Sequence, residues 1–367
     1  MNDSAVVKSF KNFGLTRTIL VAFFLLLVIV AAIQGTNIPV LMGDILRRWG
    51  MFGVLALAMV PAIQSGIGPN FGVSIGIIGG LLGALISVEM RYRGFFEAFA
   101  DNPTLDAWVS VLVAIVIALF FAVIFGIVYG ILLNRVKGNE MVVSTYVGFS
   151  IVSLFSIMWL ILPFRSGTSI WPIAGQGLRT AINLVDDFGG VFNNFLAFGV
   201  GEPPQRMNVP TGLLLVFFVL CFLMFLFSKS RTGMMMSAAG ANPAFAKAAG
   251  INVNRMRIIG TTISTALGAV GIIVYAQSFG FLQLYTAPLM MGFTSVAAVL
   301  IGGASVGRAR VFNVLLGAVL FQGILTVSMP VANVIMPGGI LAEVTRLIVS
   351  NGIILYALSR QQTGGLK

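Results

Sequence analysis

The sequence predicts an all-α, polytopic membrane protein with about ten transmembrane helices. Hydrophobic residues make up 58% of the 367 residues and charged residues only 9%, whereas soluble domains carry roughly 25% charged residues. Uncharged runs of about 20 residues, the length that crosses the hydrocarbon core, recur along the whole chain. The ten expected spans cover residues 18–34, 48–64, 70–88, 107–133, 141–163, 211–228, 258–278, 289–306, 311–328 and 341–358.

The second and third spans come from one uninterrupted stretch. Residues 49–88 contain no charge, and a single helix of that length would be roughly 60 Å long, about twice the hydrocarbon thickness. The turn formers Gly66, Gly68 and Pro69 lie near its middle,. We therefore expect a helical hairpin.

Composition excludes several kinds of chemistry. The chain has no histidine and one cysteine, Cys221, so a His/Cys zinc site, a Ser-His-Asp triad, a Cys-His pair and an internal disulfide are all ruled out within it. No G-x-x-x-x-G-K-[ST] motif occurs,. We expect no catalysis, metal or cofactor in this chain, and any ATP would be bound by another polypeptide.

Charge placement predicts the orientation. With a cytoplasmic N-terminus, ten spans put 14 of the 22 basic residues inside against Asp3 and Glu140, and eight arginines outside against nine acids. This agrees with the positive-inside rule and predicts cytoplasmic termini in a bacterial-type inner membrane, with residues 1–17 as the N-terminal segment. The net charge of +11 is then a topology signal rather than a sign of nucleic-acid binding. The first apolar run lacks a small-x-small cleavage site and is expected to stay as a span.

The predicted membrane interior lacks ionisable groups. The acidic and basic side chains fall in loops or near span ends, among them Glu89, Asp106, Glu343 and Arg346. Proton-coupled carriers need an ionisable group near the midplane, and voltage sensors and acid-lined pores need charged rows. A carrier coupled to sodium through backbone and hydroxyl oxygens remains open, as do a channel and a scaffolding subunit. A transporter driven by a separate nucleotide-hydrolysing partner remains open as well.

The longest inward-facing loop, residues 229–257, has the signals of a short capped helix. Asn242 suits the N-cap, Pro243 the first turn and Gly250 a left-handed C-terminal position,. So short a helix must be ordered by packing. Phe245 offers an apolar knob beside Lys247, and docking on a partner is the functional reading. An ordinary connector is the alternative.

At this loop the sequence resembles the permease subunits of ABC importers for ribose-like sugars, nucleosides and related solutes. The resemblance rests on Gly240 to Val253, on the Gly-Gly-x-Ser segment Val299 to Arg310, and on Gly138 to Val142, which is similar to nucleoside-type members. Arg308 replaces the second glycine of the final Gly-Gly pair. In the segment Gly68 to Gly76, Asn70 or Phe71 stands where sugar-type members have an acid.

The resemblance implies a single permease domain over residues 1–367, similar in architecture to the vitamin B12 importer permease. It implies a second permease, identical or paralogous, ABC ATPase subunits, and an extracytoplasmic solute-binding protein. The loop helix would dock on the ATPase through Asn242, Pro243, Phe245, Lys247 and Gly250. Nucleosides and simple sugars are the leading solutes, followed by a riboflavin-like vitamin.

Spans two to five and seven to ten have similar organisation and opposite direction, which predicts an inverted repeat. Small residues in both halves favour close helix packing. Polar and aromatic residues beside these breaks can bind hydroxyls or stack on rings. The expected solute pathway comprises Gln64, Asn70, Phe71, Ser74, Phe293 and Ser295.

Residues 164–210 form a long loop on the predicted outer side. Its acidic and basic residues include Arg179, Asp186 and Arg206, and Trp171 suits an interfacial anchor,. Residues 178–188 predict an amphipathic helix lying on the membrane surface. Contact with a solute-binding protein and a lid without a partner are both open.

Overall fold

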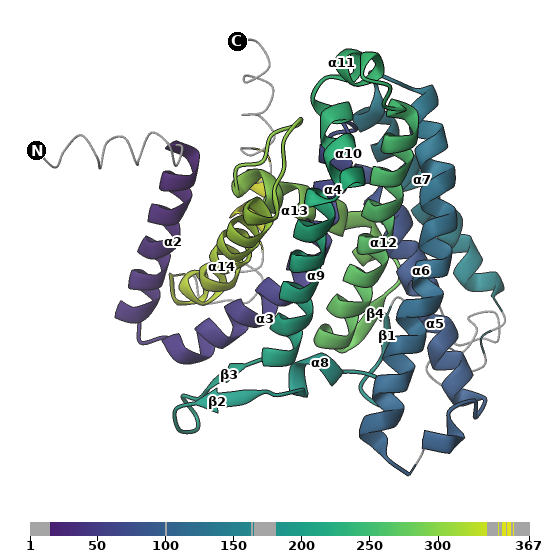
Figure 1. Cartoon of the computed structure of the whole chain (residues 1–367). Helices are drawn as coiled ribbons and strands as arrows, with labels where there is room; N and C mark the ends of the chain where they lie inside the picture. Colours follow the sequence, from purple (N-terminus) through teal and green to yellow (C-terminus); the bar gives the residue numbers. More distant parts are fainter. Residues whose placement is uncertain are drawn as a thin grey trace, which may run out of the picture.

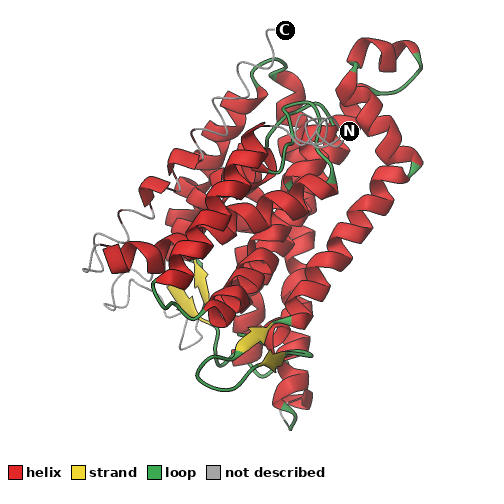
Figure 2. Cartoon of the chain, turned by 90° about the vertical axis from the view of Figure 1, so that its left-hand side faces the viewer, coloured by secondary structure: helices red, strands yellow, loops and turns green. Residues whose placement is uncertain are grey.

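The computed structural model describes residues 15–99, 101–162, 164 and 181–335, with 344, 347–349, 351–353 and 355. Long helices form a bundle, and short strands lie at one end of it (Figures 1 and 2). The longer helices are α2 (Leu15–Ile33), α3 (Ile38–Leu57), α5 (Ser74–Tyr92), α6 (Pro103–Arg135), α7 (Glu140–Ile161), α9 (Thr211–Lys229), α12 (Val253–Phe279), α13 (Thr286–Ile301) and α14 (Val311–Ile335). The residue ranges of these helices overlap nine of the ten expected spans.

Seven helical segments in the described part of the chain are long and apolar enough to cross a membrane, and residues 17–33 and 286–301 form shorter apolar helices. The prediction of a mostly helical, polytopic membrane protein is confirmed. The tenth expected span, 341–358, lies largely outside the described residues.

Shorter elements connect the long helices. They are α4 (Met59–Gln64), η1 (Phe71–Val73), η2 (Glu97–Phe99), β1 (Ala181–Asn183), α8 (Val191–Asn194), β2 (Phe198–Val200), β3 (Met207–Val209), α10 (Arg231–Ala241), α11 (Pro243–Ala248) and β4 (Phe281–Gln283).

The second expected span begins ten residues earlier than predicted. The Asn37 side chain accepts a hydrogen bond from the backbone N–H of Val40 and caps α3 at Ile38, so charged residues such as Asp44 occupy its first turns. The helix ends at Leu57, four residues before Pro61. A proline ring clashes with the carbonyl four residues earlier and cannot donate to it, which explains why α4 is a separate helix.

The expected turn between spans two and three is present at residues 65–70, but α3 and α5 are not packed as a pair. The chain turns back after α4, but α3 and α5 both pack on α12, α3 also on α14 and α5 also on α6. A Cβ atom on Gly271 of α12 would lie 2.8 Å from Leu55 of α3, and one on Gly80 of α5 would lie 2.5 Å from the carbonyl oxygen of Ala269. Small residues thus let α12 approach both helices closely, and the apolar pattern does not reveal this choice of neighbour.

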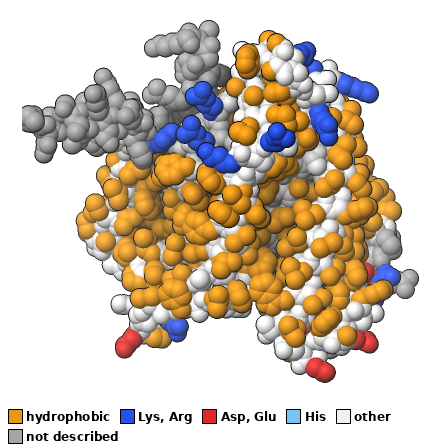
Figure 3. All heavy atoms as spheres, in the orientation of Figure 1, with side chains coloured by type: hydrophobic (Ala, Val, Ile, Leu, Met, Phe, Trp, Pro, Cys, Tyr) orange, Lys and Arg blue, Asp and Glu red, His pale blue; other side chains and the backbone are white. Residues whose placement is uncertain are grey.

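Charge separates the two ends of the bundle (Figure 3). We call the end with α10, α11 and the α13–α14 loop the basic end, because the described lysines lie there and Glu140 is its one described acid. The opposite, acidic end carries the other described acids together with arginines. This agrees with the two charge groups predicted from the sequence.

An ion cluster fixes the acidic end. The Arg91 guanidinium at the end of α5 contacts Asp106 of α6 at 2.7 Å and Asp187, in the loop after β1, at 3.1 Å. Desolvation by burial raises the pKa of the Asp187 carboxyl, and the ion pair with Arg91 opposes this shift. The cluster ties α5, α6 and the loop that carries Asp187 together.

The amphipathic helix expected at residues 178–188 is wrong for the described residues 181–188. Ala181–Asn183 form β1, which pairs antiparallel with β4, Ile182 opposite Leu282. Ile182 is buried between exposed neighbours, the period-two pattern of a strand. The Asn183 side chain then accepts from the N–H of Val185 and starts a turn,.

The Gly-Gly-x-Ser segment closes a tight hairpin between α13 and α14. A Cβ atom on Gly302 would lie 1.8 Å from the carbonyl oxygen of Asn313, and one on Gly317 would lie 1.8 Å from that of Ala298. The Asn313 side-chain amide donates to the Gly302 carbonyl at 2.7 Å. These glycines are needed where the two backbones touch.

Candidate functional site

The helix breaks between α4 and α5, inside the bundle. In the unwound segment, residues 65–70, Gly66 and Gly68 have φ angles of 78° and 89°, which glycine adopts without strain. The N–H groups of Gly66 and Ile67 close α4 by donating to the carbonyls of Ile63 and Ala62. Breaks of this kind in membrane proteins occur where other protein groups replace the lost helical bonds.

The unwound segment is clamped between two helices. A Cβ atom on Gly66 would lie 2.8 Å from the Cα of Gly240, at the end of α10. A Cβ atom on Gly260 of α12 would lie 2.5 Å from the Cβ of Ser65. Neither glycine can gain a side chain without moving the segment, so α10 and α12 hold it from two sides.

A buried network of hydrogen bonds holds the C-terminal end of the unwound segment. Asn70 is fully buried; its amide Nδ2 donates to Ser264 Oγ of α12 at 2.9 Å. The Tyr129 hydroxyl of α6 donates to Asn70 Oδ1, also at 2.9 Å. Because unpaired polar groups in this environment are costly, these bonds fix Asn70 between α6 and α12.

An aromatic group lies immediately beyond Asn70. The ring centroids of Phe71 and Phe293 are 5.4 Å apart, and that of Phe149 is 6.1 Å from Phe293. Phe71 and Phe293 are half-buried, whereas Phe149 is 39% exposed. Ser74 donates to the carbonyl of Pro288 at the start of α13. The structure thus brings four predicted pathway residues, Asn70, Phe71, Ser74 and Phe293, to one place.

The other two predicted pathway residues have different surroundings. The Ser295 hydroxyl donates to the Met291 carbonyl of its own helix at 2.6 Å. Gln64 donates to the Ala309 carbonyl at 3.0 Å and accepts from Ser228 at 3.4 Å. Gln64 therefore links α4, the end of α9 and the α13–α14 loop at the basic end. The transport role of all six residues stays a prediction.

The capped helix in the 229–257 loop is present as α11, at the extremity of the basic end (Figure 1). Asn242 Oδ1 accepts from the Phe245 N–H at 3.0 Å, Pro243 occupies the first turn, and Gly250 has a φ angle of 78°. These local features agree with the sequence prediction.

Packing orders α11, as its length requires. Ala246 is fully buried in a small cluster with Met236, Ala239, Val253 and Met256. Phe245 points away from this cluster and is 66% exposed, and Lys247 is exposed as well. The helix therefore presents an apolar ring and a positive charge to the solvent side on a fixed base.

An additional helix, α10, precedes α11 and was not predicted separately. Ser230 caps it by accepting from the Gly233 N–H. Because α10 ends at Ala241, one residue past Gly240, it connects α11 directly to the clamp on the unwound segment. The capping serine is a local signal that was available in the sequence, but the contact with Gly66 is not local.

A buried ion pair fixes the neighbouring loop. Arg257 of α12 contacts Glu140 of α7 at 2.5 Å and donates to the Leu133 carbonyl of α6. Glu140 also accepts from the Gly138 N–H at 2.9 Å. The glutamate of the Gly138 to Val142 segment thus joins three helices at the basic end.

A polar hollow of about 430 Å³ opens at the acidic end, between the start of α3 and the β2–β3 hairpin. Its polar lining consists of Asp44, Arg47, Arg206, Asn193, Asn194 and Asn208. Among the described residues, no group of three or more His, Cys, Asp or Glu side chains could hold a metal ion.

The family model described as branched-chain amino acid transport system / permease component matches residues 41–358. The chain belongs to this permease family. The family comprises transporter permease subunits rather than enzymes, and relatives of the chain are ABC permeases for nucleosides and sugars.

Three relatives illustrate the range. The nucleoside ABC transporter permease protein NupB of Lactococcus lactis is 30% identical over 38% of this chain and 37% of its own length. The ribose import permease protein RbsC of Escherichia coli is 30% identical over 34% and 38%. The galactofuranose transporter permease protein YtfT of Escherichia coli is 29% identical over 45% and 48%.

The matched region of this permease thus spans between about a third and a half of the length of these curated relatives. No significant match to a solved structure is found.

The partners that hold the permease's unwound segment were not predicted from the sequence. Tyr129 was included in an apolar span, although it is an unusual hydroxyl in such a run, and Ser264 was not singled out. Their contacts with Asn70 join positions 59 and 194 residues apart. A polar residue inside an apolar run was the available signal.

Tyr129→Phe should destabilise the permease by about 1–3 kcal/mol, because it leaves the buried Asn70 Oδ1 without its donor. The free energy of unfolding in mixed detergent micelles measures this. Tyr146→Phe is the matched control, since Tyr146 is 68% exposed and its loss should cost under about 0.5 kcal/mol. Equal stability of the two variants would contradict a stabilising hydrogen bond between Tyr129 and Asn70.

Proposed function

We propose that this chain is the permease subunit of an ATP-driven importer that moves a small polar solute, a nucleoside or simple sugar, inward by alternating access. A separate ABC ATPase binds the ATP and drives the permease through the helix at residues 242–250. A second permease, identical or paralogous, completes the path, and an extracytoplasmic solute-binding protein delivers the solute. The observation that carries this proposal is α11, an ordered helix with Phe245 exposed at the basic end.

The distribution of buried charge supports an external energy source. Among the described residues, the buried ionisable side chains Glu89, Asp106 and Arg257 lie in the last or first turns of their helices. Each forms an ion pair with a neighbouring charge. A group that changes protonation near the midplane, as in proton-coupled carriers, is not part of this arrangement.

A contiguous route supports coupling from the loop to the path. Movement of α11 would act on α10, because Ala246 is packed against Met236 and Ala239. The end of α10 touches the unwound segment through Gly240 and Gly66. That segment carries Asn70 and leads directly into Phe71. Packed, rigid elements with two arrangements are the physical basis of such transmission.

The positive-inside rule places the basic end in the cytoplasm and the acidic end outside. We propose ten spans, cytoplasmic termini and inverted halves in a bacterial-type inner membrane, as in the vitamin B12 importer permease. The polar hollow at the acidic end, with charges of both signs, then faces the solute-binding protein.

Reconstitution tests the proposed function. The permease, its ATPase and its solute-binding protein in proteoliposomes should accumulate radiolabelled adenosine or ribose only with ATP, and vanadate should stop uptake. The energy comes from hydrolysis, so ionophores should leave the rate unchanged. Accumulation by the permease alone under a sodium gradient would contradict the proposal and favour a secondary carrier.

Phe245→Asp should lower uptake at least tenfold while the protein still inserts and the ATPase still hydrolyses ATP, because a charge replaces the apolar contact. The ratio of ATP hydrolysed to solute transported measures this uncoupling. Phe245→Leu keeps an apolar side chain and should retain most uptake. Normal transport by Phe245→Asp would show that α11 does not dock through this residue.

A further inference from the structure

A file of four aromatic rings leads into the bundle from the acidic end, apart from the Phe71 group. The Tyr275 and Phe279 rings, one turn apart on α12, are stacked at 5.3 Å with 17° between their planes. Phe52 of α3 meets Tyr275 edge-on at 5.2 Å, and Phe281 of β4 meets Phe279 edge-on at 6.1 Å.

The rings differ in exposure along this file. Phe281 is 41% exposed and Phe279 is 47% exposed, whereas Tyr275 is 6% exposed. Since α12 runs from the basic end to the acidic end, the exposed rings stand at the mouth and Tyr275 lies one turn further in. A molecule that approaches this end of α12 meets an open ring face first and a hydroxyl second.

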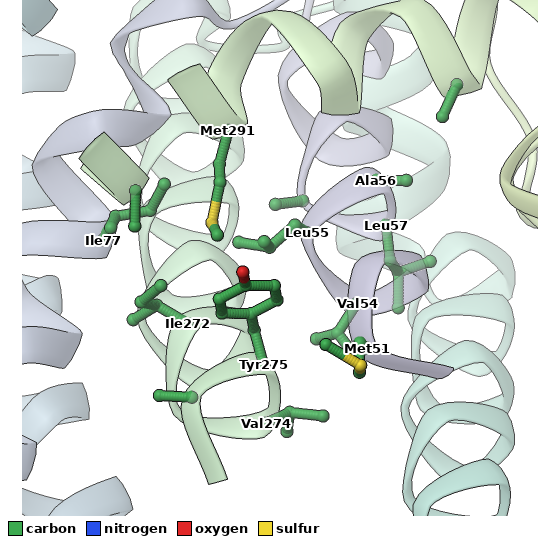
Figure 4. Close-up of a cluster of buried hydrophobic side chains, with 14 of the residues drawn as sticks. Met51, Val54, Leu55, Ala56, Leu57, Ile77, Ile272, Val274, Tyr275 and Met291 are labelled. Carbon is green, nitrogen blue, oxygen red and sulfur yellow. The ribbon is translucent and has the colours of Figure 1, made fainter. Parts of the chain in front are cut away.

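The Tyr275 hydroxyl is the polar group of this file. Figure 4 shows it pointing toward Leu55 and Met291, with Ile272 beside the ring. A hydroxyl set among apolar side chains can donate a hydrogen bond to a polar atom of a solute that reaches it.

The chemistry of the file selects the kind of solute. Each hydroxyl of a free sugar needs a hydrogen-bond partner when it leaves water, and the four rings offer one hydroxyl between them. A planar heterocyclic base buries its two faces by stacking on aromatic rings and needs few polar contacts at its edge.

We propose that Phe52, Tyr275, Phe279 and Phe281 form a stacking site for the base of a nucleoside at the outer mouth of the path. The base stacks on the exposed face of Phe279 and reaches the Tyr275 hydroxyl, which donates to a ring nitrogen or carbonyl, as it moves inward. This inference rests on the proposed function and names the solute class of the same transporter.

Uptake by the reconstituted complex tests the site, with tritiated adenosine and radiolabelled ribose as probes. Phe279→Leu should lower adenosine uptake about tenfold, within the range of one lost stacking contact, and Phe279→Trp should restore it. Tyr275→Phe should raise the KM about fivefold, the value of one hydrogen bond. Phe222→Leu, at a 58% exposed position of α9, is the matched control and should change neither.

Saturation-transfer NMR of adenosine with the full chain in nanodiscs measures binding directly and needs no ATP. The base protons should receive more saturation than the ribose protons, and Phe279→Leu should remove this difference. If Phe279→Leu transported adenosine normally and kept its NMR signal, the rings would serve only as an interfacial anchor and the inference would be wrong.

The two proposals fail in different ways. ATP-dependent ribose uptake that adenosine does not inhibit, with no saturation of the base protons, overturns the stacking site and leaves the importer intact. Adenosine binding through its base, together with uptake that ignores ATP, supports the stacking site and overturns the proposed function.

Discussion

The close contact of the unwound segment with α10 and α12 is the interaction on which the rest of the structure depends. Helical hydrogen bonds are lost at residues 65–70 in the interior of the bundle, where water is not available to replace them. Gly66, Gly240 and Gly260 allow backbones to touch there, and Asn70 is held by Tyr129 and Ser264. The segment is therefore fixed by its neighbours, and it can move only if they move.

Those neighbours lead in two directions. Toward the basic end, α10 continues into α11, which presents Phe245. Toward the interior, Asn70 is followed by Phe71, which contacts Phe293 of α13. The ion pairs at the helix ends, such as Arg257 with Glu140, hold the helices at their termini. Among the described residues, buried acidic and basic side chains lie near these ends rather than at the middle of the bundle. Such a bundle can change conformation by repacking its helices, and this change does not depend on protonation of a side chain.

The features that the sequence predicted well are local ones. Asn242, Pro243 and Gly250 define α11 because capping and left-handed glycine are decided within a few residues. Span existence and charge separation also follow from simple patterns. The neighbours of each span do not. The turn between spans two and three is where the sequence placed it, but α12, nearly 200 residues later, packs against both helices. Likewise residues 181–183 pair with a strand about 100 residues away, which overrides their helical pattern.

At the site, Asn70, Phe71, Ser74 and Phe293 were found as polar or aromatic residues beside glycine-rich breaks. Tyr129, Ser264 and the Gly66–Gly240 contact were missed because they depend on long-range packing.

Amide hydrogen exchange of the assembled transporter in lipid tests most directly whether the clamp transmits motion. Exchange is compared without nucleotide and with ATP plus vanadate. If the clamp transmits motion, the exchange of peptides covering residues 61–75 and 236–250 should change together. In Gly240→Ala, whose Cβ atom would lie 2.3 Å from the Gln64 carbonyl oxygen, residues 236–250 should still respond and residues 61–75 should not. If residues 61–75 responded equally in that variant, or failed to respond in the unmodified complex while the ATPase closed, the clamp would not be the route.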